Sequence, residues 1–171
     1  MRIYLVGFMG SGKSTLGQAV ALHYQVPFFD TDIEIELKAE MSIPDIFIDK
    51  GEYYFRDMEI KILQSTMSTD KSIIATGGGL PCHHDNMDWI LQHGISIYLD
   101  WPLATLKKRL IEQEPSRPML ANFSKEQMEQ QIESLFFQRL PFYEKSAITI
   151  EMTDDQAKNE AVLIKACKYI W

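Results

Sequence analysis

A glycine-rich loop constrains this chain more than any other feature. The loop, Gly7-Phe-Met-Gly-Ser-Gly-Lys13-Ser14, fits the pattern G-x-x-x-x-G-K-[ST]. A run typical of a β-strand precedes it, at 2–6, and a helical pattern follows it, at 13–24. Backbone N–H groups in such a loop turn inward around phosphate oxygens, and the helix N-terminus adds partial positive charge. The pattern therefore predicts a site for a nucleoside triphosphate, in which Lys13 reaches the β- and γ-phosphates and the Ser14 hydroxyl holds Mg²⁺. The predicted nucleotide contacts are Gly10, Ser11, Gly12, Lys13, Ser14 and Thr15.

Length and charge narrow the class of protein. The 171 residues fit one domain, and the formal net charge of −7 disfavours a general nucleic-acid binder, which is more often basic. No stretch of about 18 apolar residues occurs, so we expect no membrane span. Cys82 and Cys167 form no metal or redox pattern, which indicates a reducing, cytoplasmic location.

Predicted strands and helices alternate along the chain. This alternation implies an α/β fold in three α/β/α layers, with a five-stranded parallel sheet covered on both faces. The expected strands are 2–6, 26–30, 72–76, 95–100 and 147–152. The expected helices are 13–24, about 33–67 with breaks at Pro44 and Gly51, 83–93, 102–112, 125–140 and 154–170, with a loop at 113–124.

Two predicted strands end in an aspartate that could serve the magnesium ion. The run that ends in Asp100 fits the usual pattern of an apolar run followed by Asp, and by pattern alone it is favoured. Asp30 has a rival claim, because Asp32 follows it closely. Both have a structural alternative as helix caps: Asp100 for the helix near Pro102, and the Asp30-Thr31-Asp32 segment for the helix near Ile33.

Arginines and glycines recur at four further points of the chain. These are Gly51-Glu-Tyr-Tyr-Phe-Arg56, Thr76-Gly77-Gly78-Gly79, Arg117-Pro-Met-Leu120 and Arg139-Leu-Pro-Phe-Tyr143. Together with the glycine-rich loop and Asp30-Thr31-Asp32, this set resembles the shikimate kinase family, in the nucleoside-monophosphate-kinase group of P-loop folds, over essentially the whole chain. The resemblance implies a single kinase domain, 1–171, with a substrate-binding helical region at about 31–64 and a mobile lid at about 112–125.

The resemblance also implies an activity. Shikimate kinases transfer the γ-phosphoryl group of ATP to the 3-hydroxyl of shikimate, a step of aromatic amino acid biosynthesis through chorismate, with Mg²⁺ as cofactor. Asp32 matches the residue that holds the reacting hydroxyl and can accept its proton. A loose transition state needs positioning more than a strong base, so an ionised aspartate of ordinary pKa suffices. Asp30 matches the residue that orders the magnesium shell.

The remaining residues of the pattern match substrate contacts. Arg56 and Arg139 match a clamp for the shikimate carboxylate, because a guanidinium pairs with a carboxylate through two parallel hydrogen bonds. The alternative is a surface ion pair. The glycines 77–79 match a loop that brings backbone N–H groups to the ring, and its alternative is a plain strand-end turn. Just before them, Thr76 matches a small hydroxyl residue beside the magnesium water.

Two further arginines match nucleotide contacts. Arg117 matches a lid residue that approaches the γ-phosphate, and Arg109 one that stacks on adenine. Arg109 has the alternative of a cation that complements the helix dipole. The segment 151–155, opposite the expected adenine, lacks the proline that family members often carry there.

Two other functions compete with this interpretation. A gluconate kinase would also bind a carboxylate and hydroxyls, but the paired arginines and the triple glycine favour shikimate. An inactive ATP-binding scaffold is disfavoured because the loop lysine and serine, Asp32 and Arg117 are all present.

We expect ATP and shikimate as the partners of a monomer. His83 and His84 are interpreted as exposed residues at a helix start, and Cys82 as a packed thiol near the glycine loop.

Overall fold

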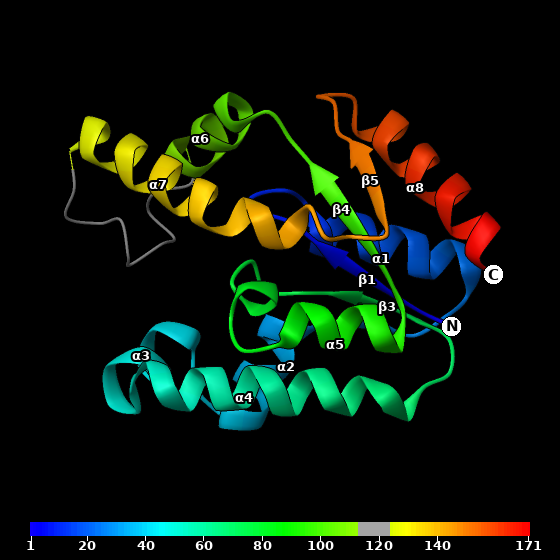
Figure 1. Cartoon of the computed structure of the whole chain (residues 1–171), viewed down its shortest axis with the longest axis horizontal. Coiled ribbons are helices and arrows are strands. Elements are labelled where there is room, and N and C mark those ends of the chain that lie inside the picture. The colour runs from blue at the N-terminus through cyan, green and yellow to red at the C-terminus, as the bar shows by residue number, and fades with distance from the viewer. Residues whose placement is uncertain (113–123) are drawn as a thin grey trace.

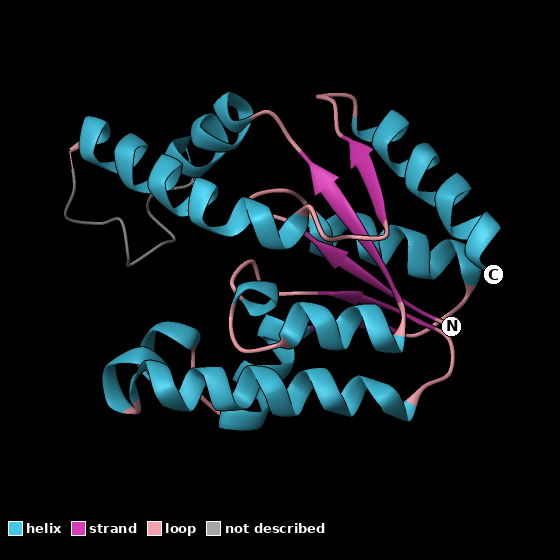
Figure 2. Ribbon diagram, viewed as in Figure 1, coloured by secondary structure: helices cyan, strands magenta, loops and turns pink. Residues whose placement is uncertain are grey.

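A five-stranded, all-parallel sheet forms the centre of the molecule, and its arrowheads point toward the same end (Figure 2). The computed structural model describes residues 1–112 and 124–171. The strand order is β2-β3-β1-β4-β5. The strands are β1 (Arg2–Val6), β2 (Phe28–Asp30), β3 (Ser72–Ala75), β4 (Ile95–Asp100) and β5 (Ile148–Glu151). The predicted α/β class and five-stranded parallel sheet are confirmed.

Helices cover both faces of this sheet (Figure 1). On one face α1 and α8 pack together, and the Tyr24 hydroxyl donates a hydrogen bond to the Ile164 carbonyl at 2.7 Å. On the other face lie α5, whose Trp89 meets Tyr4 edge to face, and α7, whose Tyr143 stacks on Tyr98. The helices are α1 (Lys13–Tyr24), α2 (Thr31–Ala39), α3 (Ile43–Asp49), α4 (Gly51–Ser65), α5 (Asn86–His93), α6 (Leu103–Glu112), α7 (Lys125–Tyr143) and α8 (Gln156–Ile170).

In residues 1–112 and 124–171, the buried apolar side chains form two separate clusters. In the central strand β1 the run Ile3-Tyr-Leu-Val6 is fully buried, because helices cover both of its faces. The second cluster ties α2, α3 and α4 into a group that lies below the sheet in the view of Figure 1. This group corresponds to the predicted substrate-binding helical region. Its buried members are Ile35, Ile46, Phe55, Met58 and Ile62.

Parallel pairing places the ends of three strands at one edge of the sheet. Ala75 pairs with Leu5 of β1 on one side and with Asp30 of β2 on the other. The chain therefore leaves β1, β2 and β3 at neighbouring points of the same edge, where ligands bind in open α/β sheets.

Proline positions explain two of the differences from the expected pattern. The helix expected from His83 begins at Asn86, because a 3₁₀ turn, Leu80–Cys82, contains Pro81 and is followed by extended His83 and left-handed His84 (φ 52°). Pro44 does not break a helix; it lies in the first turn of α3, where a missing N–H costs nothing.

Helix α7 and the strands differ by smaller amounts. Helix α7 runs through Pro141 to Tyr143, three residues beyond the expected end. Strand β2 is shorter than expected, and α2 begins at Thr31. The expected lid, about 112–125, falls mostly on residues 113–123, outside the described residues. In the described parts of the chain, each helix is too short or too polar to cross a membrane.

Candidate active site

The P-loop, residues 7–14, closes around the Lys13 ammonium group. Gly12 adopts the left-handed conformation (φ 82°), which turns the chain sharply into α1. Lys13 is buried, and its Nζ donates hydrogen bonds to the carbonyls of Gly7 and Phe8 (both 2.8 Å) and to the Ser11 hydroxyl (3.1 Å). The loop thus holds a cation at the start of a helix, a combination that attracts phosphate.

A cavity of about 310 Å³ opens between the P-loop and the ends of β2 and β3. It brings together residues that lie far apart in the sequence: the P-loop, Asp30 and Asp32, and one residue of the glycine run. Of the nucleotide contacts predicted at 10–15, Ser11 alone is absent from the lining, and its side chain is fully buried; Arg109 is not among the lining residues either. The cavity is lined by Met9, Gly10, Gly12, Lys13, Ser14, Thr15, Asp30, Asp32, Thr76 and Gly78.

The Asp30 carboxylate uses its two oxygens for two different partners. Its Oδ2 accepts a hydrogen bond from the Ser14 hydroxyl at 2.5 Å, and its Oδ1 accepts one from the Asp32 N–H at 3.1 Å. The second bond caps α2, so Asp30 is the cap within the predicted segment. The helix begins at Thr31, two residues earlier than expected. A serine hydroxyl beside a carboxylate is a hard oxygen donor set, which fits Mg²⁺. Capping and metal binding are therefore compatible in one residue.

The Asp32 carboxylate lies at the cavity wall in a partly buried position. Burial, and then the neighbouring Asp30 carboxylate, raise the pKa of Asp32 to about 6, although Lys13 and Arg56 act to lower it. An ordinary pKa would suffice for positioning, but the desolvation of this position, which the sequence does not show, raises it. A pKa closer to neutrality makes a carboxylate a stronger base.

The middle residue of the Asp-Thr-Asp segment ties it to the glycine run. Thr31 is fully buried, and its hydroxyl accepts a hydrogen bond from the Gly77 N–H at 2.7 Å. Thr76 is also buried, and its hydroxyl donates to the Leu5 carbonyl at 2.9 Å. A Cβ on Gly77 would lie 2.3 Å from Asp32 Oδ1. Glycine is required at this position because the Asp32 carboxylate occupies the space of a side chain.

Replacing Gly77 with alanine is therefore expected to displace the Asp32 carboxylate while the fold is kept. The clash involves the end of a side chain, so Asp32 can rotate away at a small cost in stability. We expect kcat to fall by about tenfold or more, because a displacement of about 1 Å can cost that much. Steady-state kinetics would measure the loss, with ATP binding and the thermal unfolding midpoint as controls. Unchanged kcat would contradict this account of Gly77.

Arg56 and Arg139 lie against the same glycine, although they come from different helices. A Cβ on Gly79 would lie 3.1 Å from Arg56 Nη1 and 3.4 Å from Arg139 Nη2. Among the described residues, none forms an ion pair with Arg139, so the alternative of a surface ion pair, for which Glu133 and Glu144 are near in the sequence, does not hold for Arg139. Arg56 does form ion pairs, with Glu52 and Glu59. Both guanidinium groups thus lie beside the glycine run, but the charge of Arg56 is offset by its two glutamate partners.

Glu59 is a site residue that sequence reasoning missed. Its side chain is buried beside Arg56, with Oε2 2.8 Å from Arg56 Nη1. Burial raises the pKa of Glu59 to about 7, although Arg56 acts to lower it. The signal was present, because Glu59 falls between Phe55 and Ile62 on the apolar face of α4, where a carboxylate needs a partner.

Arg109 joins α6 to the turn after β5. Its guanidinium carbon lies 3.7 Å from the centre of the Trp101 ring, and its Nη2 lies 3.6 Å from Asp154 Oδ1. The Trp101 N–H donates to the Ser11 carbonyl of the P-loop at 2.9 Å. Arg109 therefore has specific partners beyond the helix dipole, and Trp101, to which no function was assigned, connects it to the phosphate loop.

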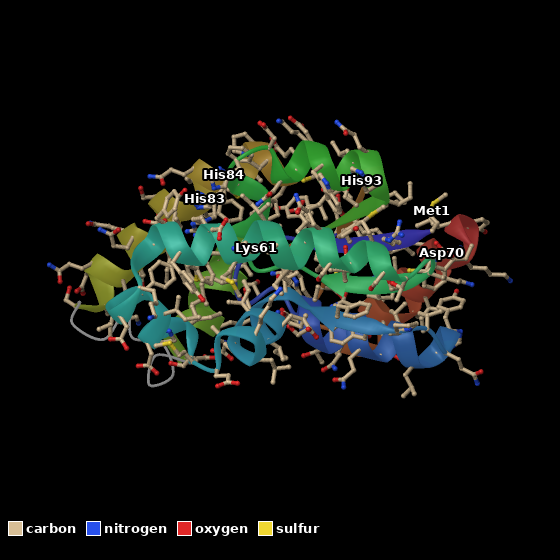
Figure 3. All side chains as sticks on the ribbon, turned by 90° about the horizontal axis from the view of Figure 1, so that it is seen from below. Met1, Lys61, Asp70, His83, His84 and His93 are labelled. Carbon is tan, nitrogen blue, oxygen red and sulfur yellow. The ribbon has the colours of Figure 1, made fainter. Side chains whose placement is uncertain are left out.

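Other predicted residues lie elsewhere. Asp100 does not line the cavity, and α6 begins at Leu103, which places Pro102 rather than Asp100 at the cap position. Arg117 lies outside the described residues. His83 and His84 lie near the start of α5, with His93 at its other end (Figure 3). Both precede the helix, and His83 is partly buried rather than exposed.

The Cys82 thiol is packed near the glycine run rather than activated. It is partly buried, and its Sγ lies 4.0 Å from the Gly78 carbonyl oxygen. Burial raises the pKa of the thiol to about 11, so it is protonated at neutral pH and is a poor nucleophile there.

Comparisons with known proteins agree on one family. The family model for shikimate kinase matches residues 9–169. A shikimate kinase from Microcystis aeruginosa is 42% identical over 154 residues, which cover 90% of this chain and 78% of that protein. The crystal structure of shikimate kinase from Bacteroides thetaiotaomicron superposes with a TM-score of 0.88 at 30% identity, covering 99% and 97% of the two chains. That of the Acinetobacter baumannii enzyme in complex with shikimate gives a TM-score of 0.87 at 34% identity, covering 98% and 92%.

Proposed function

This chain belongs to the shikimate kinase family, whose members phosphorylate shikimate with ATP in aromatic amino acid biosynthesis, and we propose how its residues share that reaction. The proposal rests on one observation: the groups that would bind the two substrates meet at one edge of the sheet. There a phosphate-binding loop, a desolvated aspartate and two arginines are held around one cavity and its rim. Phosphoryl transfer depends mainly on positioning and on electrostatic stabilisation, and this arrangement supplies both.

The P-loop and Asp30 form the proposed site for the nucleotide and its metal. The N–H groups of residues 10–15 surround the phosphates, and the Lys13 ammonium offsets the charge of the β- and γ-phosphates. Ser14 and Asp30 would hold Mg²⁺, Asp30 through a metal-bound water. When bound, Mg²⁺ would offset the negative charge on the β- and γ-phosphate oxygens. Ser14 and Asp30 are already in contact, so the two donors converge on one point.

Asp32 is the proposed base for the 3-hydroxyl of shikimate. Its carboxylate lines the cavity beside Lys13, between the nucleotide site and the arginines. From there it accepts a hydrogen bond from the reacting hydroxyl and orients the oxygen toward the γ-phosphate. It then takes the proton as the hydroxyl oxygen bonds to the γ-phosphorus and the bond from that phosphorus to the β–γ bridging oxygen breaks, so that ADP leaves. Gly77 keeps the space for this carboxylate open.

The arginines and the glycine run form the proposed shikimate site. Arg56 and Arg139 bind the substrate carboxylate from two sides, and the backbone N–H groups of residues 77–79 meet the ring hydroxyls. Arg109 stacks on the adenine from the side of α6. Arg117, proposed to offset charge on the transferred phosphoryl group, lies outside the described residues, and its role rests on the sequence resemblance alone.

A coupled assay of ADP release tests the proposal. With ATP and Mg²⁺, we expect turnover with shikimate and a rate lower by about a hundredfold or more with gluconate, because gluconate cannot place its hydroxyls on the same donors. Chelation of the metal with EDTA should abolish the turnover, and added Mg²⁺ should restore it. ATP binding without transfer to either acid would instead support an inactive ATP-binding protein.

Three properties of the whole protein stay predictions from the sequence. These are a single kinase domain over 1–171 with a lid at about 112–125, a monomeric state and a cytoplasmic location. Limited proteolysis, gel filtration and cell fractionation would test them in turn.

A further inference from the structure

We propose that Tyr143 is a positioning residue for shikimate, acting through the backbone of the glycine run. The inference rests on the function proposed above for residues 77–79. Tyr143 has no exposed surface, and its hydroxyl donates a hydrogen bond of 2.5 Å to the Gly78 carbonyl. Tyr143 belongs to the same sequence segment as Arg139, but the family resemblance assigns a role in the reaction only to Arg139.

The three carbonyls of the glycine run are held in two different ways. Those of Gly77 and Gly79 accept hydrogen bonds from the Leu80 and Cys82 N–H groups within the following turn, at 3.1 Å and 2.9 Å. The Gly78 carbonyl instead points toward α7, where the Tyr143 hydroxyl lies. Tyr143 is therefore the contact that ties the middle of the run to a helix outside it.

Peptide geometry carries the effect of this bond to the substrate side. The Gly78 carbonyl and the Gly79 N–H belong to one trans peptide unit, so they point in opposite directions. Fixing the carbonyl toward Tyr143 therefore directs the N–H away from α7. Within the described residues, this N–H donates to no protein acceptor, which leaves it for a ligand. A hydrogen bond to the carbonyl also polarises the peptide and strengthens its N–H as a donor.

Helix α7 also sets the distance between the glycine run and the arginine clamp, because it carries both Tyr143 and Arg139. Arg139 and Tyr143 are four residues apart on α7 and so share a face of the helix. Arg139 lies against Gly78 and Gly79, and Tyr143 bonds to Gly78. The hydroxyl thus fixes the spacing between the proposed N–H donor and the guanidinium that binds the carboxylate. Burial raises the pKa of Tyr143, so the phenol stays protonated and keeps donating.

The variant Tyr143→Phe removes the hydroxyl and keeps the ring. We expect the KM for shikimate to rise by about tenfold, because small displacements of binding groups are costly, while the KM for ATP stays unchanged. A purely structural role would lower stability without this difference between the two substrates. The matched control is Tyr98→Phe. The Tyr98 ring stacks on that of Tyr143, with centroids 5.5 Å apart, but the hydrogen bond to the Gly78 carbonyl comes from Tyr143 alone of the two. This variant should leave both KM values unchanged.

An amide measurement keeps the test independent of turnover. In ¹⁵N–¹H spectra the Gly79 resonance should move when shikimate binds to the wild-type protein. In Tyr143→Phe we expect it to start at a different position and to move less at saturation. Arg139→Ala, measured beside it, separates the two proposals. If Arg139→Ala weakens shikimate binding and Tyr143→Phe changes neither the KM nor the Gly79 resonance, the role of Tyr143 is refuted. If neither variant weakens shikimate binding, the proposed shikimate site itself is wrong.

Discussion

The variant Asp32→Asn should fold and bind ATP but lose almost all turnover. The amide has the size of the carboxylate, so the packing against Gly77 is kept, whereas it cannot accept a proton from the 3-hydroxyl. We expect kcat to fall by about a hundredfold to a thousandfold, the usual contribution of a positioned base. The KM for ATP should stay the same or decrease slightly, because one negative charge near the phosphates is removed.

Steady-state kinetics with both substrates, together with ATP binding by calorimetry, would measure these effects. The useful control is Asp100→Asn, because Asp100 ends a strand in the same way but does not line the cavity. Turnover close to that of the wild type in Asp32→Asn would remove Asp32 from the chemistry. A large loss in Asp100→Asn would instead revive the competing assignment from the sequence pattern.

Local chemistry made the phosphate loop and the sheet predictable. The glycine and lysine spacing of the P-loop needs a strand before it and a helix after it, and helix α1 runs over 13–24 as expected. The errors occur where distant contacts decide. Helix α7 continues through Pro141 because Tyr143 is buried against Tyr98 and bonded to Gly78, contacts that no local pattern contains.

The choice between two strand-end aspartates could not be made from the pattern. Both Asp30 and Asp100 lie at the carboxyl end of a strand, and parallel topology brings both ends to the same edge. They differ in their contacts: the Asp30 side chain accepts a hydrogen bond from the Ser14 hydroxyl of the P-loop. The sequence placed the cap within the Asp30-Thr31-Asp32 segment but did not show which residue forms it; Asp30 caps α2 and accepts the Ser14 hydrogen bond at the same time.

Desolvation is the other property that the sequence hid. The pKa of Asp32, near 6, does not follow from the sequence, since it depends on how α2 packs, whereas the burial of Glu59 was indicated by its place on the apolar face of α4. Glu59 matters for the design of experiments on the clamp. Arg56→Ala would leave Glu59 buried without its partner, and that loss would destabilise the protein apart from any effect on shikimate. A test of Arg56→Ala should therefore be made in combination with Glu59→Gln, which removes the unpaired buried charge.

Arg139 therefore gives the cleaner test of the carboxylate clamp. Among the described residues, none depends on it for an ion pair, and its other contacts are with the side chain of Tyr143 and the ring of Phe8, so Arg139→Ala should lower the thermal unfolding midpoint less than Arg56→Ala. A hydrogen bond to a charged group contributes about 1.5–3 kcal/mol, which corresponds to a rise in the KM for shikimate of about tenfold to a hundredfold. Arg139→Lys should recover only part of the affinity, because an ammonium group keeps the charge but loses the bidentate geometry. Shikimate kinetics at saturating ATP would measure both variants. An unchanged KM in Arg139→Ala would contradict the clamp, and full recovery in Arg139→Lys would reduce it to charge attraction alone.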